Sequence, residues 1–152
     1  MRRYDCESNE RWQGFAHRGD DIVISTRSKN GTTWLQMICA LLVFQDPELP
    51  APLAEVSPWL DWDVETAGAT QRRLAKQNHR RIIKTHTPLD GLPLDGRVTY
   101  LVTGRHPLDA AVSMYHLGDA WERQGTLNVT MVHYQATGRS SGLAGRAKAE
   151  RC

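Results

Sequence analysis

The chain has 152 residues, 40% of them hydrophobic and 24% charged, which is the balance of one globular domain with a moderate core. Its formal net charge of +2 is too small to indicate a nucleic-acid partner. The three cysteines lack the spacing of a metal or redox site, and no apolar run approaches the roughly 18 residues of a membrane span. We therefore expect a cytoplasmic protein without an integral membrane segment.

The first predicted elements are a strand and a helix separated by a short polar loop. Residues 1–20 are polar and are expected to lead up to a strand at about 21–25, where β-branched residues occupy positions 22–24. The loop 25–31 is followed by an apolar segment, 32–44, with two stripes at helical spacing. This segment predicts a helix that is apolar on most sides and therefore largely buried.

The strand, loop and helix around residues 21–44 have the layout of a phosphate cradle, since loop N–H groups and the helix N-terminus would face one point. Gly31 allows close approach of the backbone, Lys29 adds a positive charge, and Thr32 and Thr33 add hydroxyl groups. The loop is not a Walker loop, because its lysine precedes the glycine. By shape alone, an ordinary strand-to-helix turn explains this segment as well as a phosphate site does.

The middle of the chain predicts a long loop, a surface helix and a second strand. Prolines at 47, 50, 52 and 58 favour a loop over these positions. Trp59 and Trp62 at its end either pack the loop down or form the wall of an acceptor pocket. Residues 65–78 read as a polar surface helix, and Ile82 begins a strand that leads to His86. Pro88 disfavours helical backbone at the preceding residue, so His86 is expected at the end of that strand.

A third strand is predicted at 98–102, followed by a turn and another helix. Pro107 suits the first helical position and Asp109 the first turn, while Ser113 lies two turns beyond Arg105. After residue 117 only weak strand signals survive, around 129–134. Residues 138–152 are rich in Gly, Ala, Ser and Arg, and no structure is expected there.

Ionisable groups thus follow three predicted strands: Lys29 the first, Lys84 and His86 the second, and Arg105 the third. In an open α/β sheet these positions share the edge where ligands bind. The pattern indicates a site for a polyanion with a general base beside it. Taken singly, His86 could be structural, and Arg105 could cap a helix or pair with an aspartate.

Three segments, in order, resemble motifs of one enzyme family. Residues 28–34 (SKNGTTW) resemble its PKSGTTW loop, residues 84–86 its KTH segment, and residues 105–113 its RxPxDxxxS segment. Over about 11–117 the chain resembles the nucleotide-binding half of sulfotransferases that use 3′-phosphoadenosine 5′-phosphosulfate (PAPS). The resemblance is strongest to mycobacterial members, some of which sulfate glycolipids. It implies an α/β, P-loop-containing nucleotide hydrolase-like three-layer fold with a central parallel sheet, of which this chain holds the N-terminal half.

The resemblance also implies an activity and its residues. PAPS would donate a sulfuryl group to a hydroxyl of a small molecule or glycolipid, and no metal would be needed. His86 would act as the general base, Lys29 would stabilise charge on the leaving oxygen, and Lys84 would orient the sulfonate. The implied nucleotide site consists of Lys29, Asn30, Gly31, Thr32, Thr33, Trp34, Arg105 and Ser113. Within it, Trp34 would stack on adenine, and Arg105 with Ser113 would bind the 3′-phosphate.

The sequence departs from the family in the loop and at the C-terminal end. Ser28 stands where many members have proline, and Asn30 where most have serine. The late Arg-Lys-Gly loop and Gly-Asp-Trp segment of the family are not found. We therefore expect a lead-in at 1–20, a PAPS-binding part at 21–117 and a divergent, poorly ordered tail at 118–152, such as a frameshift or truncated gene would produce.

These departures leave three readings open. The first is a working sulfotransferase, and the second is a non-catalytic remnant with at most weak nucleotide binding. A P-loop kinase-like protein is the third, and the missing Gly-Lys-Ser/Thr disfavours it. The sequence supports no expectation of oligomeric state. Helices without their family neighbours are expected to expose apolar surface and to make the chain marginally stable.

Overall fold

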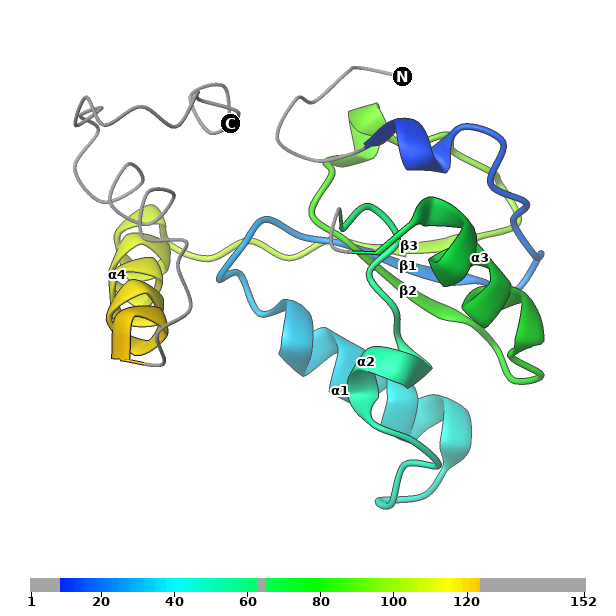
Figure 1. The fold of residues 1–152 in the computed structure, drawn as a ribbon, viewed down its shortest axis with the longest axis horizontal. Helices are drawn as coiled ribbons and strands as arrows, with labels where there is room; N and C mark the ends of the chain where they lie inside the picture. Colours follow the sequence, from blue (N-terminus) through cyan, green and yellow to red (C-terminus); the bar gives the residue numbers. More distant parts are fainter. Residues whose placement is uncertain (1–8, 63–64, 124–152) are drawn as a thin grey trace.

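Three short strands form a parallel sheet at the centre of the computed structural model, which describes residues 9–62 and 65–123 (Figure 1). The strands are β1 (Ile22–Ser25), β2 (Ile82–Thr85) and β3 (Thr99–Leu101), in the order β2-β1-β3. Ile22 is in register with Ile82 on one side and with Thr99 on the other. The carboxyl ends of all three strands therefore lie at one edge, and the predicted parallel sheet is confirmed.

Helices cover both faces of this sheet because side chains alternate along each strand. On one face, Ile22, Ile24 and Ile82 pack against α1 (Thr32–Phe44) and α2 (Leu53–Val56). On the other, Val23 and Ile83 pack with residues of η1 (Asn9–Trp12), α3 (Ala67–Lys76) and the segment that follows η2 (Leu89–Gly91). The result is the expected three-layer arrangement.

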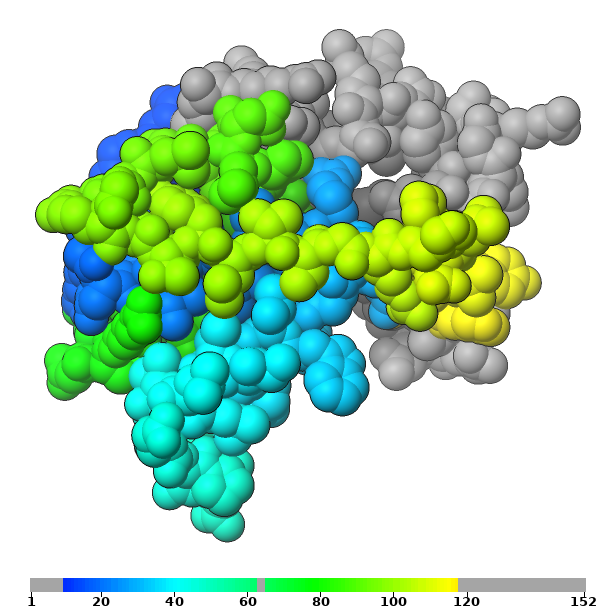
Figure 2. Space-filling model, turned by 180° about the vertical axis from the view of Figure 1, so that it is seen from behind, coloured from blue at the N-terminus to red at the C-terminus, as the bar shows by residue number. Residues whose placement is uncertain are grey.

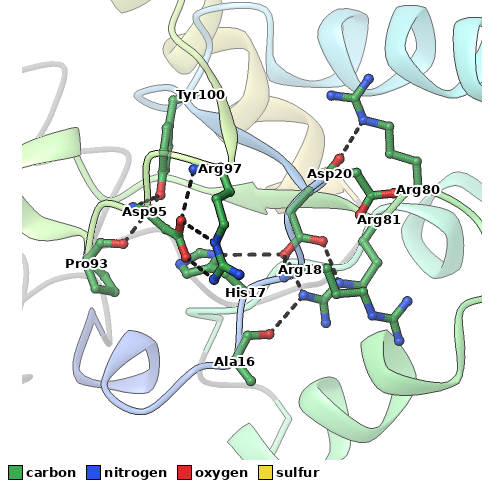
Figure 3. Close-up of polar contacts among 11 residues, drawn as sticks. Ala16, His17, Arg18, Asp20, Arg80, Arg81, Pro93, Asp95, Arg97 and Tyr100 are labelled. Atoms are coloured by element: carbon green, nitrogen blue, oxygen red, sulfur yellow. Dashed lines mark hydrogen bonds and ion pairs between the residues drawn. The ribbon is translucent and has the colours of Figure 1, made fainter.

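A buried ion pair holds the amino ends of the strands, opposite the edge where the strands end. Arg81 donates to both carboxylate oxygens of Asp21, with Nε 2.7 Å from Oδ1, and both side chains are buried. Burial alone would raise the pKa of Asp21, but the nearby His17, the Arg81 guanidinium and the Arg18 amide together lower it to about 2. The backbone oxygen of Asp21 also accepts from Thr99. Figure 3 shows Arg81, which directly precedes β2, close to His17 and Arg18 of the segment that precedes β1.

The last described helix, α4 (Pro107–Arg123), stands apart from the sheet at the end of an extended connection (Figure 1). It begins at Pro107 with Asp109 in its first turn, as predicted. In Figure 2 the connection from β3 crosses the visible face as a narrow ridge before it reaches α4. The helix leaves Leu108, Val112 and Tyr115 exposed.

Three expectations about the elements need correction. Helix α1 is not largely buried: Leu42 is 66% exposed, and Ile38, Met37 and Leu41 are also exposed, because the described segments cover only the face that carries Cys39 and Ala40. The proline-rich loop contains the single-turn helix α2, for which Pro52 supplies the preceding residue with φ −51°. Strand β3 is shorter than 98–102.

Helix α4 continues to Arg123, six residues past the point at which the tail was expected to begin. The weak strand signals at 129–134 and the segment 138–152 lie outside the described residues. No helix in the described ranges is both long and apolar enough to cross a membrane.

Candidate active site

The loop after β1 enters α1 through two residues with left-handed backbone, Lys29 at φ 62° and Gly31 at φ 90°. Gly31 precedes the helix, and no side chain caps the helix N-terminus. The N–H groups of its first turn are thus left for a ligand, in a region that favours negative charge. The hydroxyls of Thr26 and Thr32 are hydrogen-bonded to each other inside the loop, whereas Thr33 is exposed.

Asn30 joins this loop to the segment that follows β3. Its Nδ2 donates to the backbone oxygen of Ser28 (2.9 Å), and its Oδ1 accepts from the backbone N–H of Arg105 (2.8 Å). The backbone oxygen of Asn30 in turn accepts from the hydroxyl of Thr103 (2.6 Å). Asn30, one of the two residues that depart from the family loop, therefore fixes the backbone position of Arg105 after β3, a contact that sequence reasoning did not foresee.

His86 lies directly after β2, as predicted, and its ring is buried. Its Nδ1 is 2.6 Å from the backbone oxygen of Thr26, so Nδ1 carries the proton and Nε2 keeps its lone pair. Desolvation lowers the pKa of His86 to about 4, with the positive charges of Lys84 and Arg27 acting in the same direction. With its pKa lowered in this way, the ring is neutral at pH 7.

The Trp59 indole contacts both His86 and Lys84. The His86 ring meets the indole edge-to-face at 4.5 Å, and the Lys84 ammonium lies 3.9 Å from the centre of the same indole. Trp62 stacks on Trp59 with ring centres 5.1 Å apart and is about half exposed. An aromatic wall thus stands beside the histidine.

The remaining predicted site residues make fewer contacts. Within the described ranges the Lys29 ammonium forms no hydrogen bond or ion pair, and the side chain of Ser113 likewise forms none. Trp34 is 78% exposed. Arg105 Nε lies 3.8 Å from Asp109, and both side chains are largely exposed, so this ion pair contributes little. The structure brings Arg105 to the loop through its backbone and leaves its guanidinium accessible.

Two groups at the site were missed from the sequence. Thr26 orients His86 through a backbone oxygen, which no side-chain pattern reveals. Asp61 is buried and hydrogen-bonded to Trp59, and its position between two tryptophans in an apolar stretch was the available signal.

Other features of the described residues do not compete with this site. No group of three or more His, Cys, Asp or Glu residues able to hold a metal occurs among them. A hollow of about 480 Å³ lies between α1 and the β1–β3 edge, lined by residues such as Cys39, Leu42 and Leu101. Its lining includes none of the predicted site residues, and we base no catalytic role on it.

Comparison with known proteins agrees with this geometry. The sulfotransferase domain model matches residues 19–141. The glycolipid sulfotransferases of Mycobacterium tuberculosis (strain ATCC 25177 / H37Ra) and Mycobacterium bovis are each 54% identical over 108 residues, which is 71% of this chain and 33% of theirs. Dog sulfotransferase 1A1 is 35% identical over 121 residues, covering 75% of this chain and 41% of the dog protein.

Comparison of the fold with solved structures also finds a sulfotransferase. The crystal structure of mouse sulfotransferase SULT7A1 complexed with PAP matches with a TM-score of 0.51 and 26% identity, over 74% of this chain and 40% of the mouse chain. The chain thus spans about one third of the length of the mycobacterial proteins it matches. The matched domain, the motif order and the parallel sheet together show that the chain belongs to the sulfotransferase family.

Proposed function

We propose that the chain takes part in PAPS-dependent transfer of a sulfuryl group to a hydroxyl acceptor, with His86 as the general base. The observation that carries this proposal is the position of His86: its free Nε2 belongs to a ring that is anchored on the phosphate-type loop itself, through the Thr26 oxygen. A base from the end of β2 that is anchored on the anion cradle would hold the acceptor and the donor close together.

The residues present suit the anionic groups of PAPS. The uncapped start of α1 and the exposed Thr33 would donate to the 5′-phosphate, and Lys29 would neutralise charge on the oxygen that leaves sulfur. The accessible guanidinium of Arg105 would bind the 3′-phosphate in forked geometry, with Ser113 beside it. The exposed Trp34 would stack on adenine. These cations and N–H donors would do the work of a metal ion.

Proton transfer would run through Nε2 of His86. The acceptor hydroxyl would give its proton to this nitrogen as its oxygen bonds to sulfur and the bond from sulfur to the bridging phosphate oxygen breaks. PAPS supplies the sulfuryl group, and PAP is the leaving product. The hydrogen bond from Nδ1 to Thr26 would keep the ring in the tautomer that can accept. Lys84, above the same indole as His86, would orient the sulfonate.

The acceptor is proposed to be a hydroxyl-bearing small molecule or a glycolipid. The stacked pair of Trp59 and Trp62 offers a flat apolar face next to the base, which suits a sugar ring or an aromatic alcohol. The names of the mycobacterial relatives favour the glycolipid.

Transfer of radioactive sulfate from labelled PAPS by the purified full chain tests the proposal. Acceptors should include a glycolipid and a simple phenol, and the variants His86→Gln and Lys29→Met should be assayed beside the wild type. We expect labelled product with the wild type and a loss of at least about a hundredfold with His86→Gln. Nucleotide binding without transfer to any acceptor would contradict the proposal and indicate a non-catalytic member of the family.

A further inference from the structure

Asp61 is a buried carboxylate that four neutral groups contact. Oδ1 accepts from Nε1 of Trp59 at 2.7 Å, and Oδ2 accepts from the hydroxyl of Thr87 at 2.5 Å. The hydroxyl of Thr85 and the indole N–H of Trp12, at 3.4 Å, also donate to Oδ2. Only 2% of Asp61 is exposed. An ionised carboxylate only accepts hydrogen bonds, so four donors aimed at it satisfy its bonding capacity without a bound ligand.

Two of these donors flank His86 in the chain. Thr85 and Thr87 point to the same side because they are two residues apart in extended backbone, and His86 points to the other side. The backbone N–H of Thr87 also donates to the Thr85 hydroxyl at 2.9 Å. Asp61 thus accepts hydrogen bonds from the residues on both sides of His86. The His86 ring itself is hydrogen-bonded to the backbone oxygen of Thr26.

A third donor to Asp61 is the indole N–H of Trp59, which belongs to the aromatic wall beside His86. The indole of Trp59 packs edge-to-face against the His86 ring, and its N–H is tied to Asp61. The same carboxylate therefore fixes the position of the backbone that carries His86 and the position of the Trp59 indole that packs against it. A shift of Asp61 would move both relative to the loop after β1, to which Asp61 has no hydrogen bond within the described ranges.

We propose that Asp61 is a positioning residue that sets the orientation of His86 and of the Trp59 wall. It would act without touching substrate, through hydroxyl groups on either side of the histidine and directly on the indole. The catalytic part of this inference rests on the proposed sulfotransferase activity, whereas the structural part can be tested without turnover.

The test compares Asp61→Asn with a matched control, Asp21→Asn, in the full chain. Both aspartates are buried, but Asp21 lies at the opposite edge of the sheet with Arg81 as its partner. An asparagine at 61 has one acceptor oxygen in place of two and places an NH₂ group against N–H or O–H donors. The readouts are the ring-nitrogen signals of His86 in ¹⁵N-histidine-labelled protein, assigned by their loss in His86→Gln, and calorimetric binding of PAP.

We expect Asp61→Asn to move the His86 signals from the Nδ1–H tautomer toward a mixture, with the dissociation constant for PAP changed by less than about twofold. Turnover should fall about tenfold or more, because small misplacements of a base carry large losses. Asp21→Asn should leave the His86 signals in place. Should Asp61→Asn fail to fold, Thr87→Val takes its place, because it removes one of the four donors. The His86 ring-nitrogen signals and PAP binding are then measured on that variant.

Unchanged His86 signals in the variant at position 61, or in Thr87→Val if that is the variant that folds, would overturn the proposal. Equal changes in the two aspartate variants would also overturn it, since they would show a general loss of stability. If the wild type binds PAP but transfers no sulfate, the proposed activity fails, and the ring-nitrogen comparison still decides whether Asp61 positions His86.

Discussion

Burial of His86 makes the stability of the fold sensitive to acid in a defined window. The pKa of the ring is lowered to about 4 in the folded chain, mainly by desolvation, against an ordinary value of 6.5. As the pH falls from 6.5 toward 4, the unfolded chain binds a proton at this residue and the folded chain does not. Folding stability contributed by the neutral ring is therefore fully present above pH 6.5 and is lost through this window.

The size of the effect follows from the two values. At pH 4.5 the unfolded state gains about 2–3 kcal/mol from protonation of His86 relative to the folded state, and at pH 7.5 it gains almost nothing. This is a large share of the stability of a small domain. The variant His86→Gln keeps a polar side chain of similar length and removes the titration. It should therefore lose about 2–3 kcal/mol less than the wild type between pH 7.5 and pH 4.5.

Urea unfolding followed by tryptophan fluorescence measures this difference directly. Urea titrations of both proteins are made at pH 7.5, 6.0, 5.0 and 4.5. The change in unfolding free energy between pH 7.5 and pH 4.5 is then compared for the two proteins. Carboxylates titrate in both proteins and cancel in the comparison. Parallel pH dependences in wild type and His86→Gln would refute the reasoning, because they would place an ordinary, solvated histidine at this position.

Three other substitutions test separate parts of the structure. Asn30→Ala removes three side-chain hydrogen bonds that fix the loop and the Arg105 backbone, so PAP affinity in calorimetry should fall about five- to tenfold; unchanged affinity would show that this junction is unimportant. Gly31→Ala meets no neighbour within 4 Å but has φ of +90°, and unfolding in urea should show a loss of about 1–2 kcal/mol. Arg81→Met leaves Asp21 buried without its bidentate partner and should lower stability by about 3–5 kcal/mol, with Asp21→Asn in the same chain restoring part of it; no restoration would contradict the pairing.

Much of the layout was predictable because it depends on local pattern. The β-branched run at 22–24, the polar loop and the apolar segment at 32–44 each specify one element, and parallel strands then place their ends together. The position of His86 at the end of a strand followed from Pro88. These features required no knowledge of distant contacts.

The rest depended on contacts that no local pattern contains. The junction of Asn30 with Arg105 joins residues 75 positions apart, and the anchor of His86 is a backbone oxygen 60 positions away. Periodicity showed that α1 is apolar but not which segments would cover it, and its exposed face was therefore missed. The lowered pKa of His86 likewise arises from burial, which residue type alone does not determine.

The central claim is that the loop of β1 and the start of α4 together form a nucleotide site. Calorimetric titration of the full chain with PAP tests it most directly, beside Arg105→Ala and a control, Arg72→Ala, which removes another exposed arginine from α3. The account predicts micromolar binding by the wild type and by Arg72→Ala, and its loss in Arg105→Ala. A folded chain that does not bind PAP, or binding that is indifferent to Arg105, would contradict it.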